Sequence, residues 1–231
     1  MTSVVAILLA YLIGSAPNGY LVVKWMTGQN LLRVGSGRTG ATNAMRAAGL
    51  PAGFITACLD IGKGGLAIWV ARFLLSGQVW VPSNAWIEAA TAIAVVAGHN
   101  WSIYIRFRGG AGTGPNVGAA IALWPPAALV LLPFVPVVLF STGYASVASL
   151  TTALLIPALF AAIAFVFNAP WEFVVYGVIT FCIVTWSLRS NIERLRKGEE
   201  RMVGPRADRR LRQTLADQSE HQERPRVNQA K

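Results

Sequence analysis

The residues best suited to chemistry lie between positions 34 and 46, in the segment VGSGRTGATNAMR. This segment holds three glycines, three hydroxyl side chains, one amide and two arginines. Glycine lets backbone N–H groups approach a phosphate closely, and an arginine such as Arg46 binds phosphate oxygens through its forked guanidinium. The same residue types also make ordinary connecting loops. The segment therefore predicts an anion-binding loop, with a plain connection as the alternative.

A second glycine-rich segment covers residues 106–114 (RFRGGAGTG) and begins with two arginines. Its glycines can present a concave row of backbone N–H groups to a phosphate. It is not the P-loop of nucleotide-binding enzymes, because it lacks the final Gly-Lys-Ser/Thr and no predicted strand precedes it. Two such loops in one chain, each with arginine, favour a site for anionic substrates.

Asp60 and Lys63 stand in the middle of an apolar stretch, three positions apart, so they share one face of a helix and can pair. A charged pair inside a membrane is costly unless it faces the protein interior. Two roles stay open for it: a structural pair that orients neighbouring helices, or direct contact with substrate. His99 ends another apolar stretch, and a lone histidine there is more typical of a structural hydrogen bond than of a catalytic base.

The composition is that of an integral membrane protein. Of the 231 residues, 54% are hydrophobic and 13% are charged, whereas soluble domains carry about 25% charged residues. Charge is also segregated, since 12 of the 20 lysines and arginines follow Ser187. The other basic residues flank apolar stretches as topology signals, so we expect a lipid bilayer and no nucleic acid as partner. Cys58 and Cys182 lie in apolar runs, so we expect no disulfide framework, metal site or cofactor.

The elements that position these residues are predicted to be transmembrane helices. Apolar stretches cover residues 3–25, 50–75, 86–105, 117–140, 145–166 and 171–187. Two spans separate the two arginine-bearing loops, so both loops lie on one side, which the positive-inside rule makes the cytoplasm.

The basic end of the chain belongs on that side too, which requires an even number of crossings after the second loop. Pro125-Pro126 splits the fourth stretch into a hairpin and restores this parity. We therefore predict an all-α polytopic membrane bundle of seven transmembrane helices, with the N-terminus outside and the C-terminus cytoplasmic. Residues 1–200 form the membrane domain, and residues 201–231, which are charged and poor in apolar side chains, form a disordered cytoplasmic tail.

Six short motifs stand in order along the chain. They are Gly-Ser-Gly-x-x-Gly-Ala-Thr-Asn-x-x-Arg at 35–46, Asp-x-x-Lys-Gly at 60–64, Gly-His at 98–99, Arg-Phe-Arg-Gly-Gly-x-Gly at 106–112, Tyr-x-Ser-x-x-Ser at 144–149 and Arg-x-Asn-Ile-x-Arg-Leu at 189–195. Together they resemble the acyl-phosphate-dependent glycerol-3-phosphate acyltransferases, the PlsY family. The resemblance covers about residues 3–200, and its first motif is long and specific.

The resemblance implies transfer of an acyl group from acyl phosphate to the 1-hydroxyl of glycerol 3-phosphate, which gives lysophosphatidic acid and phosphate. It implies an enzyme of phospholipid synthesis in the cell membrane, with its active site facing the cytoplasm and the acyl chain between helices. The implied catalytic residues are Ser36, Arg46 and Asn191. It also implies a glycerol 3-phosphate loop of Gly109, Gly110 and Gly112, with Ser146 beside it. The further candidates for substrate binding in this chain are Arg38, Thr42, Asn43, Lys63, Arg106 and Arg108.

This chain departs from the family's pattern at two positions that matter for chemistry. Ala111 stands in place of a lysine in the second loop, and Leu188 stands in place of a histidine at the last motif. Arg38, where the family usually has asparagine, is a candidate for the replaced cation, and the phosphate leaving group can itself take the hydroxyl proton. We favour an active acyltransferase, and the alternative is a non-catalytic or repurposed paralogue that binds a phospholipid precursor in the membrane. A transporter is disfavoured, because no internal repeat is visible.

Overall fold

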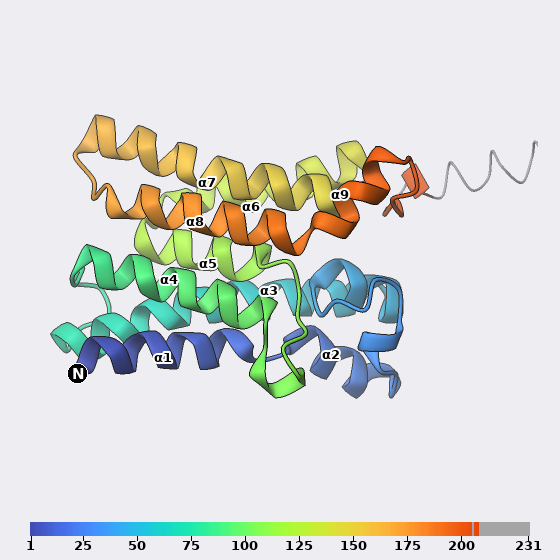
Figure 1. Cartoon of the computed structure of the whole chain (residues 1–231), viewed down its shortest axis with the longest axis horizontal. Helices are drawn as coiled ribbons and strands as arrows, with labels where there is room; N and C mark the ends of the chain where they lie inside the picture. Colours follow the sequence, from blue (N-terminus) through green and yellow to red (C-terminus); the bar gives the residue numbers. More distant parts are fainter. Residues whose placement is uncertain (205, 208–231) are drawn as a thin grey trace, which may run out of the picture.

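The computed structural model describes residues 1–204 and 206–207, and its helices run side by side along one long axis (Figure 1). The elements in chain order are α1 (Thr2–Ser15), α2 (Asn18–Thr27), the 3₁₀ helix η1 (Leu31–Arg33), α3 (Ala41–Ser76), α4 (Ala85–Asn100), the 3₁₀ helix η2 (Ile103–Ile105), α5 (Thr113–Leu123), α6 (Ala127–Thr142), α7 (Ala145–Phe167), α8 (Glu172–Ser187) and α9 (Arg189–Arg196). Within these described residues the sole β feature is an isolated antiparallel bridge between Ser102 and Arg108. The predicted all-α class is confirmed.

The first predicted span consists of two helices, because the chain breaks at Pro17, which cannot continue a helix through its missing N–H. Helix α1 packs very closely against α4. A Cβ atom added to Gly14 would lie 2.1 Å from the carbonyl oxygen of Val95, and one added to Gly98 would lie 2.2 Å from that of Tyr11. Only glycine fits at these two contacts, which let the two helix backbones approach closely.

Helix α3 is 36 residues long and bends near its N-terminus. Ala48 and Gly49 have non-helical backbone angles there, and Gly49 lies in the left-handed region at φ +81°. The part after this bend corresponds to the span predicted at 50–75. The first turns of α3, which carry Asn43 and Arg46, are therefore set off from the apolar part and belong to the polar end of the molecule.

The fourth apolar stretch is a hairpin of α5 and α6, as Pro125-Pro126 predicts, because both prolines lie in the turn between the two helices. The main core lies between α3, α4, α5, α7 and α8. At its centre the ring of Phe160 meets the rings of Phe173 and Tyr176 edge to face, with centroids 5.6 and 5.9 Å apart.

Among the described residues, three helical segments are long and apolar enough to cross a membrane: Thr2–Thr27, Ala41–Ser76 and Ala145–Phe167. The pair α8 and α9, bent by 62°, makes a fourth if it counts as one span. Helix α6 is apolar but shorter. The membrane-embedded class agrees with the prediction, while the count of seven crossings and the sides of the two termini stay predictions. Residue 205 and residues 208–231 of the predicted tail lie outside the described part of the chain.

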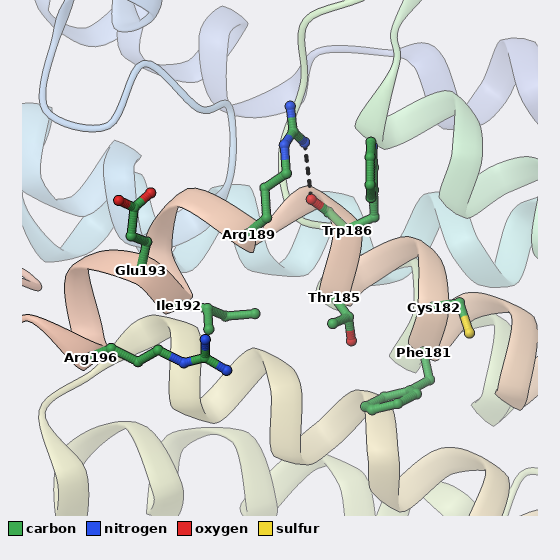
Figure 2. Close-up of a pocket in the computed structure, with 8 residues that line it drawn as sticks. All are labelled: Phe181, Cys182, Thr185, Trp186, Arg189, Ile192, Glu193 and Arg196. Atoms are coloured by element: carbon green, nitrogen blue, oxygen red, sulfur yellow. Dashed lines mark hydrogen bonds between the residues drawn. The ribbon is translucent and has the colours of Figure 1, made fainter.

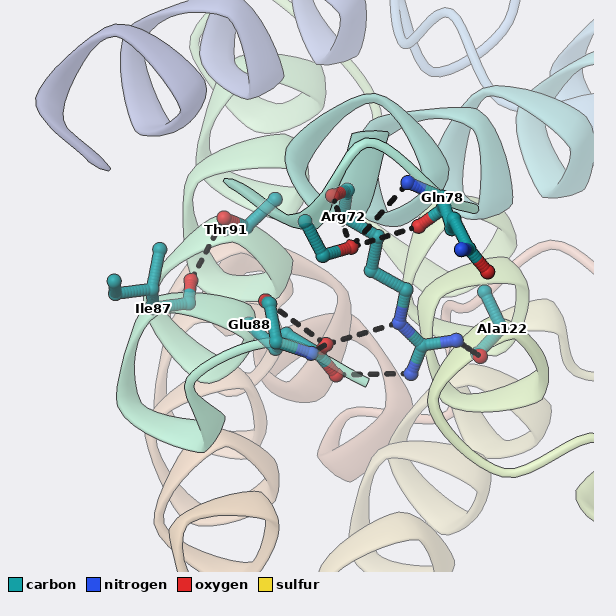
Figure 3. A network of polar contacts seen from close by, with 8 residues as sticks. Arg72, Gln78, Ile87, Glu88, Thr91 and Ala122 are labelled. Atoms are coloured by element: carbon teal, nitrogen blue, oxygen red, sulfur yellow. Dashed lines mark hydrogen bonds and ion pairs between the residues drawn. The ribbon is translucent and has the colours of Figure 1, made fainter. Parts of the chain in front are cut away.

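A buried ion pair ties α3 to α4 (Figure 3). Arg72 donates from Nε and Nη2 to the two carboxylate oxygens of Glu88, both at 2.9 Å, and from Nη1 to the carbonyl of Ala122 at 3.1 Å. Glu88 also accepts from the backbone N–H of Ser83 at 2.6 Å and from its hydroxyl at 3.1 Å. A buried pair needs such additional hydrogen bonds to offset the cost of taking two charges out of water.

Breaking this pair is predicted to destabilise the bundle. Glu88→Leu leaves the Arg72 guanidinium buried and unpaired, which costs about 3 to 5 kcal/mol. The double variant Arg72→Met with Glu88→Leu removes both charges and is expected to recover most of that loss. Thermal unfolding in detergent measures the effect, and a single variant as stable as the double would contradict this prediction.

Candidate active site

Polar segments that are far apart in sequence meet toward the end of the bundle away from the N-terminus (Figure 1). The backbone N–H of Thr39 in the first glycine-rich loop donates to the carbonyl of Gly109 in the second, at 3.3 Å. The guanidinium of Arg38 donates to the carbonyl of Ser187 at the end of α8. The two loops predicted to bind anions therefore form one site with the end of α8.

The first loop is organised by the amide of Asn43, which is 3% exposed. Its Nδ2 donates to the carbonyls of Val34 and Arg38 at 3.0 and 2.9 Å, and its Oδ1 accepts from the N–H of Ser36 at 3.1 Å. Both ends of the amide are thus used by loop backbone. This geometry favours a positioning role for Asn43 over the predicted contact with substrate.

Ser36 lies exposed at the tip of this loop, between two glycines with left-handed backbone. Gly35 has φ +58°, and a Cβ atom added to it would lie 2.3 Å from Asn43 Oδ1. The loop can follow this path only with glycine at position 35. Its shape leaves the Ser36 hydroxyl accessible, and within the described chain that hydroxyl makes no hydrogen bond.

Two half-buried arginines stand beside the loop. Arg46 donates from Nη2 to the carbonyl of Arg201 at 3.0 Å. Burial lowers the pKa of Arg38 below its ordinary value, and the nearby positive charge of Arg194 lowers it further, while the carboxylate of Glu200 acts in the opposite direction. Arginine stays protonated at neutral pH in spite of such shifts. The site is therefore cationic.

Asn191 follows the elbow between α8 and α9 and is buried. Its Nδ2 donates to Oε1 of Glu200 at 2.8 Å, and the other oxygen of Glu200 lies 3.4 Å from Nε of Arg194. The segment that follows Glu200 lies against the turn between α6 and α7, since the N–H of Val203 donates to the carbonyl of Gly143 at 2.8 Å. Our sequence analysis missed Glu200, because nothing in its local sequence distinguishes it from other charged residues near the tail.

The glycines of the second loop fit closely against the end of α4. The N–H of Gly110 donates to the carbonyl of His99 at 3.1 Å. A Cβ atom added to Gly109 would lie 2.0 Å from that same carbonyl oxygen. Gly112, at φ +89°, is the N-cap of α5, so the loop ends at a helix N-terminus, where anions are stabilised.

Several buried polar atoms near the site have no hydrogen-bond partner in the described part of the protein. They are Asn100 Oδ1, Thr113 Oγ1, Ser146 Oγ, Thr185 Oγ1 and Asn191 Oδ1. Buried polar groups are normally paired, so such a set indicates a polar binding region. Ser146, predicted to bind substrate, is among them at 1% exposure.

The remaining predicted site residues divide by environment. Thr42 is half-buried in the first turn of α3, whereas Arg106 and Arg108 lie exposed on the hairpin between α4 and α5. Lys63 is buried at 6% exposure, and its ammonium is 2.8 Å from the carbonyl of Ala16 and 3.0 Å from Asp60 Oδ1. Of the two roles left open for Lys63, this geometry favours the structural one.

Ala111 and Leu188, the two positions at which the sequence analysis expects a departure from the family's pattern, lie together. Leu188 is buried with Ala153 and Val184, and Ala111 packs against the same apolar cluster. A lysine and a histidine would each need polar surroundings there, which these neighbours do not supply. Arg38 reaches the carbonyl of Ser187, next to Leu188, so a cation stands beside this cluster.

A cavity of about 490 Å³ follows α8 and α9 beside the site. Figure 2 shows Phe181, Thr185, Ile192 and Arg196 pointing to one side of this helix pair, whereas Arg189 points to the other. The wall is mostly apolar along α8, and toward α9 it carries two arginines, Arg189 and Arg196, and one carboxylate, that of Glu193. An amphiphile with an acyl chain and an anionic head matches this distribution.

The sequence of this chain is similar to known proteins over nearly its whole apolar part. The profile of the glycerol-3-phosphate acyltransferase family matches residues 4–198. A glycerol-3-phosphate acyltransferase of Thermosynechococcus vestitus is 39% identical over 85% of this chain and 93% of that protein. One of Thermus thermophilus is 38% identical over 91% of this chain and 100% of that protein.

The fold is also similar to solved structures. Two crystal structures of PlsY, an integral membrane glycerol 3-phosphate acyltransferase, cover 88% of this chain and 96% of theirs. The glycerol 3-phosphate form has a TM-score of 0.75 at 28% identity, and the lysophosphatidic acid form has 0.73 at 27%. The resemblance drawn from the motifs is confirmed, and because the family profile spans most of the chain, this protein belongs to the glycerol-3-phosphate acyltransferase family of integral membrane proteins.

Proposed function

We propose that this protein transfers an acyl group from acyl phosphate to the 1-hydroxyl of glycerol 3-phosphate and releases lysophosphatidic acid and phosphate. Membership of the family and likeness to PlsY structures in the glycerol 3-phosphate and lysophosphatidic acid forms support this reaction. The observation that carries it is the contact between the two glycine-rich loops, through Thr39 and Gly109. This contact lies beside Arg38 and Arg46 and near the mostly apolar cavity along α8 and α9.

The chemistry suits such a site. The 1-hydroxyl oxygen of glycerol 3-phosphate attacks the acyl carbon, a new ester C–O bond forms, and the bond between the acyl carbon and the phosphate oxygen breaks. The electron pair of that bond leaves with phosphate, which also takes the hydroxyl proton. Acyl phosphate is a mixed anhydride and already activated, so the step needs no protein nucleophile. Positioning two anions and stabilising developing charge supplies the rate.

Arg46 and Arg38 bind phosphate oxygens in this proposal. Each guanidinium has five N–H donors, and each is seen to use one of them within the described chain. Ser36 offers its accessible hydroxyl at the reacting centre, and Asn191 completes the site from α9.

Further residues hold or attract the substrates. The glycerol 3-phosphate loop consists of Gly109, Gly110 and Gly112, and Thr42 and Ser146 add hydroxyl groups. Because the N–H of Gly110 already donates to the His99 carbonyl, Gly109 and Gly112 supply the N–H donors for phosphate. Arg106 and Arg108, exposed at the loop, steer anionic substrates toward it. The acyl chain lies along the apolar side of α8. Asn43 and Lys63 act indirectly, because their polar atoms are already used inside the protein.

The second candidate function is a non-catalytic or repurposed paralogue that binds a phospholipid precursor. It is favoured by one observation, the apolar cluster in which Ala111 and Leu188 replace the family's polar side chains. Such a protein binds glycerol 3-phosphate or lysophosphatidic acid without turnover.

One assay distinguishes the two candidates. Purified protein in detergent is mixed with acyl phosphate and glycerol 3-phosphate, and phosphate release and lysophosphatidic acid are both measured. Release of one phosphate for each lysophosphatidic acid formed supports the acyltransferase. Binding of glycerol 3-phosphate by calorimetry with neither product supports the paralogue. Omission of glycerol 3-phosphate controls for hydrolysis of the donor.

The proposed location is the cell membrane, with seven crossings and the active site facing the cytoplasm. Single cysteines introduced at Arg38, Arg108 and Gln213, after replacement of the two native cysteines, are expected to react from the cytoplasmic side. A cysteine at Asn84, in the loop between α3 and α4, is expected to react from outside. Labelling of intact cells detects cysteines on the outside, and labelling of inverted vesicles detects those on the cytoplasmic side. Reaction of position 213 from outside would mean an odd number of crossings after the second loop and would contradict the count of seven.

A further inference from the structure

A buried polar network lies behind the second glycine-rich loop, and the proposed reaction does not use it. It consists of Asn18 at the start of α2, Asp60 and Lys63 on α3, and His99 at the end of α4. Asp60, Lys63 and His99 are 3%, 6% and 4% exposed. We propose that these are positioning residues, which hold the second glycine-rich loop in the shape that binds glycerol 3-phosphate; the inference rests on the proposed function of that loop.

Lys63 is the centre of the network. Its ammonium lies 3.0 Å from Asp60 Oδ1, 2.9 Å from His99 Nδ1 and 2.8 Å from the carbonyl of Ala16 at the break between α1 and α2. An ammonium has three N–H donors, so these contacts use all of them. Asn18 Nδ2 donates to the same carboxylate oxygen at 3.1 Å. The network therefore joins α2, α3 and α4 at one point and leaves Lys63 no donor for substrate.

The contact with Lys63 determines which nitrogen of the His99 ring carries the proton. An ammonium can only donate, so Nδ1 accepts, and the single ring proton of the neutral imidazole is then on Nε2. The ring is held at Nδ1 by this bond, and the helix ends at Asn100 directly after it. Its orientation is consequently determined by α3 as well as by its own helix.

The ring and backbone of His99 form the surface on which the loop rests. A Cβ atom added to Gly110 would lie 2.1 Å from His99 Nε2, and the N–H of Gly110 donates to the His99 carbonyl. The loop touches the network again at Gly114, where an added Cβ atom would lie 2.7 Å from Cβ of Asp60. The loop is thus held between two members of the network.

The same contacts continue to the first loop, since Gly109 accepts from the N–H of Thr39. A shift of the His99 ring therefore displaces the backbone N–H groups proposed to bind glycerol 3-phosphate. A displaced loop holds glycerol 3-phosphate less tightly and aligns its hydroxyl less well, so KM for glycerol 3-phosphate rises and kcat can fall with it, while KM for acyl phosphate stays unchanged. This difference between the two KM values separates the positioning role from a purely structural one.

The chain contains a matched control. The Arg72 and Glu88 pair also joins α3 to α4 and is equally buried. Both of its members make further hydrogen bonds, but their described partners, Ala122 and Ser83, belong to neither glycine-rich loop (Figure 3). If the network around Lys63 only stabilises the bundle, its disruption is expected to lower Tm and leave both KM values unchanged, as we expect for disruption of this pair.

The experiment uses two substitutions at His99 in the full chain. In His99→Leu the ring volume is filled but the acceptor for Lys63 is lost, whereas in His99→Gln the amide oxygen can accept from Lys63 again. We expect His99→Leu to raise KM for glycerol 3-phosphate at least about fivefold and to leave KM for acyl phosphate within about twofold. His99→Gln is expected to recover most of the change.

The control is the single variant Glu88→Leu, which is expected to lower Tm without a change in either KM. The double variant Asp60→Asn with Lys63→Met, which neutralises the pair, is expected to follow His99→Leu. A drop in Tm of His99→Leu with both KM values unchanged would reduce the network to a structural role and overturn the inference. Equal rises in both KM values, or a fall in kcat alone, would overturn it as well.

Failure of the proposed reaction gives a different result. If the wild-type protein releases no phosphate, the acyltransferase assignment fails, and calorimetric binding of glycerol 3-phosphate replaces KM in the same set of variants. Weaker binding in His99→Leu, with recovery in His99→Gln, then supports the positioning role. Unchanged binding in His99→Leu, or a wild-type protein that does not bind glycerol 3-phosphate, overturns it.

Discussion

Arg46→Ala is expected to lower the rate of lysophosphatidic acid formation roughly a hundred- to a thousandfold. The guanidinium stands half-buried at the base of the first loop, where one of its nitrogens already donates to the carbonyl of Arg201. Its other donors can grip a phosphate in a forked geometry that water does not replace in a partly dry site. Because the charge on phosphate changes as the acyl bond breaks, we expect the loss in kcat as well as in kcat/KM.

The matched control is Arg33→Ala. Arg33 is an exposed arginine at the end of η1 in the same loop region. Its loss removes the same formal charge, so general electrostatic attraction of substrate falls equally in both variants. We expect Arg33→Ala to stay within about threefold of wild type at moderate ionic strength. Activity of Arg46→Ala near the wild-type level, in folded protein, would remove Arg46 from the site.

Asn43→Ala is expected to produce the second large effect, a loss of activity on the order of a hundredfold, although the side chain touches no substrate in our proposal. The substitution frees two loop carbonyls, those of Val34 and Arg38, and the N–H of Ser36. These groups are partly buried, and a buried unpaired group costs about 1 to 3 kcal/mol, so the loop is expected to rearrange to satisfy them. Rearrangement moves Ser36 and Arg38 together, and steady-state kinetics with both substrates measures the result.

Asn30→Ala is the corresponding control. Asn30 also uses its side-chain oxygen to accept a loop N–H, that of Leu32 at 3.0 Å, but this bond caps η1 and does not order the backbone around Ser36. Its loss is expected to cost about 1 kcal/mol of stability and little activity, as for a lost N-cap. Equal activities in the two variants would show that the amide of Asn43 does not determine the shape of the site.

Much of the fold was predictable because the relevant signals are local. Long apolar runs report burial in lipid, and Pro125-Pro126 stops a helix wherever it stands, so the hairpin of α5 and α6 follows from the chain alone. The bend of α3 at Gly49 was missed, since a glycine two positions before a proline does not reveal whether the helix resumes beyond it. The residue types of the two glycine-rich loops likewise indicate anion chemistry without knowledge of their partners.

The partners themselves could not be read from the sequence. Asp60 and Lys63 indicate a pair through their spacing, yet the third member, His99, is 36 positions from Lys63 and is brought there by the packing of α3 against α4. Glu200 resembles its neighbours in the charged run until the chain turns back after α9 and brings it to Asn191. Such contacts depend on the relative placement of helices, which local propensity does not specify.

The family, the helical membrane class and the residue types available for binding phosphate all follow from the amino-acid sequence, because each depends on composition, short motifs or apolar length. Which of those residues face the site follows from the packing of the helices. The packing assigned Asn43 and Lys63 to internal hydrogen bonds and placed Ala111 and Leu188 in one apolar cluster. The physical reason is that a side chain's role follows from which donors and acceptors remain unused after packing, and packing joins residues that are distant along the chain.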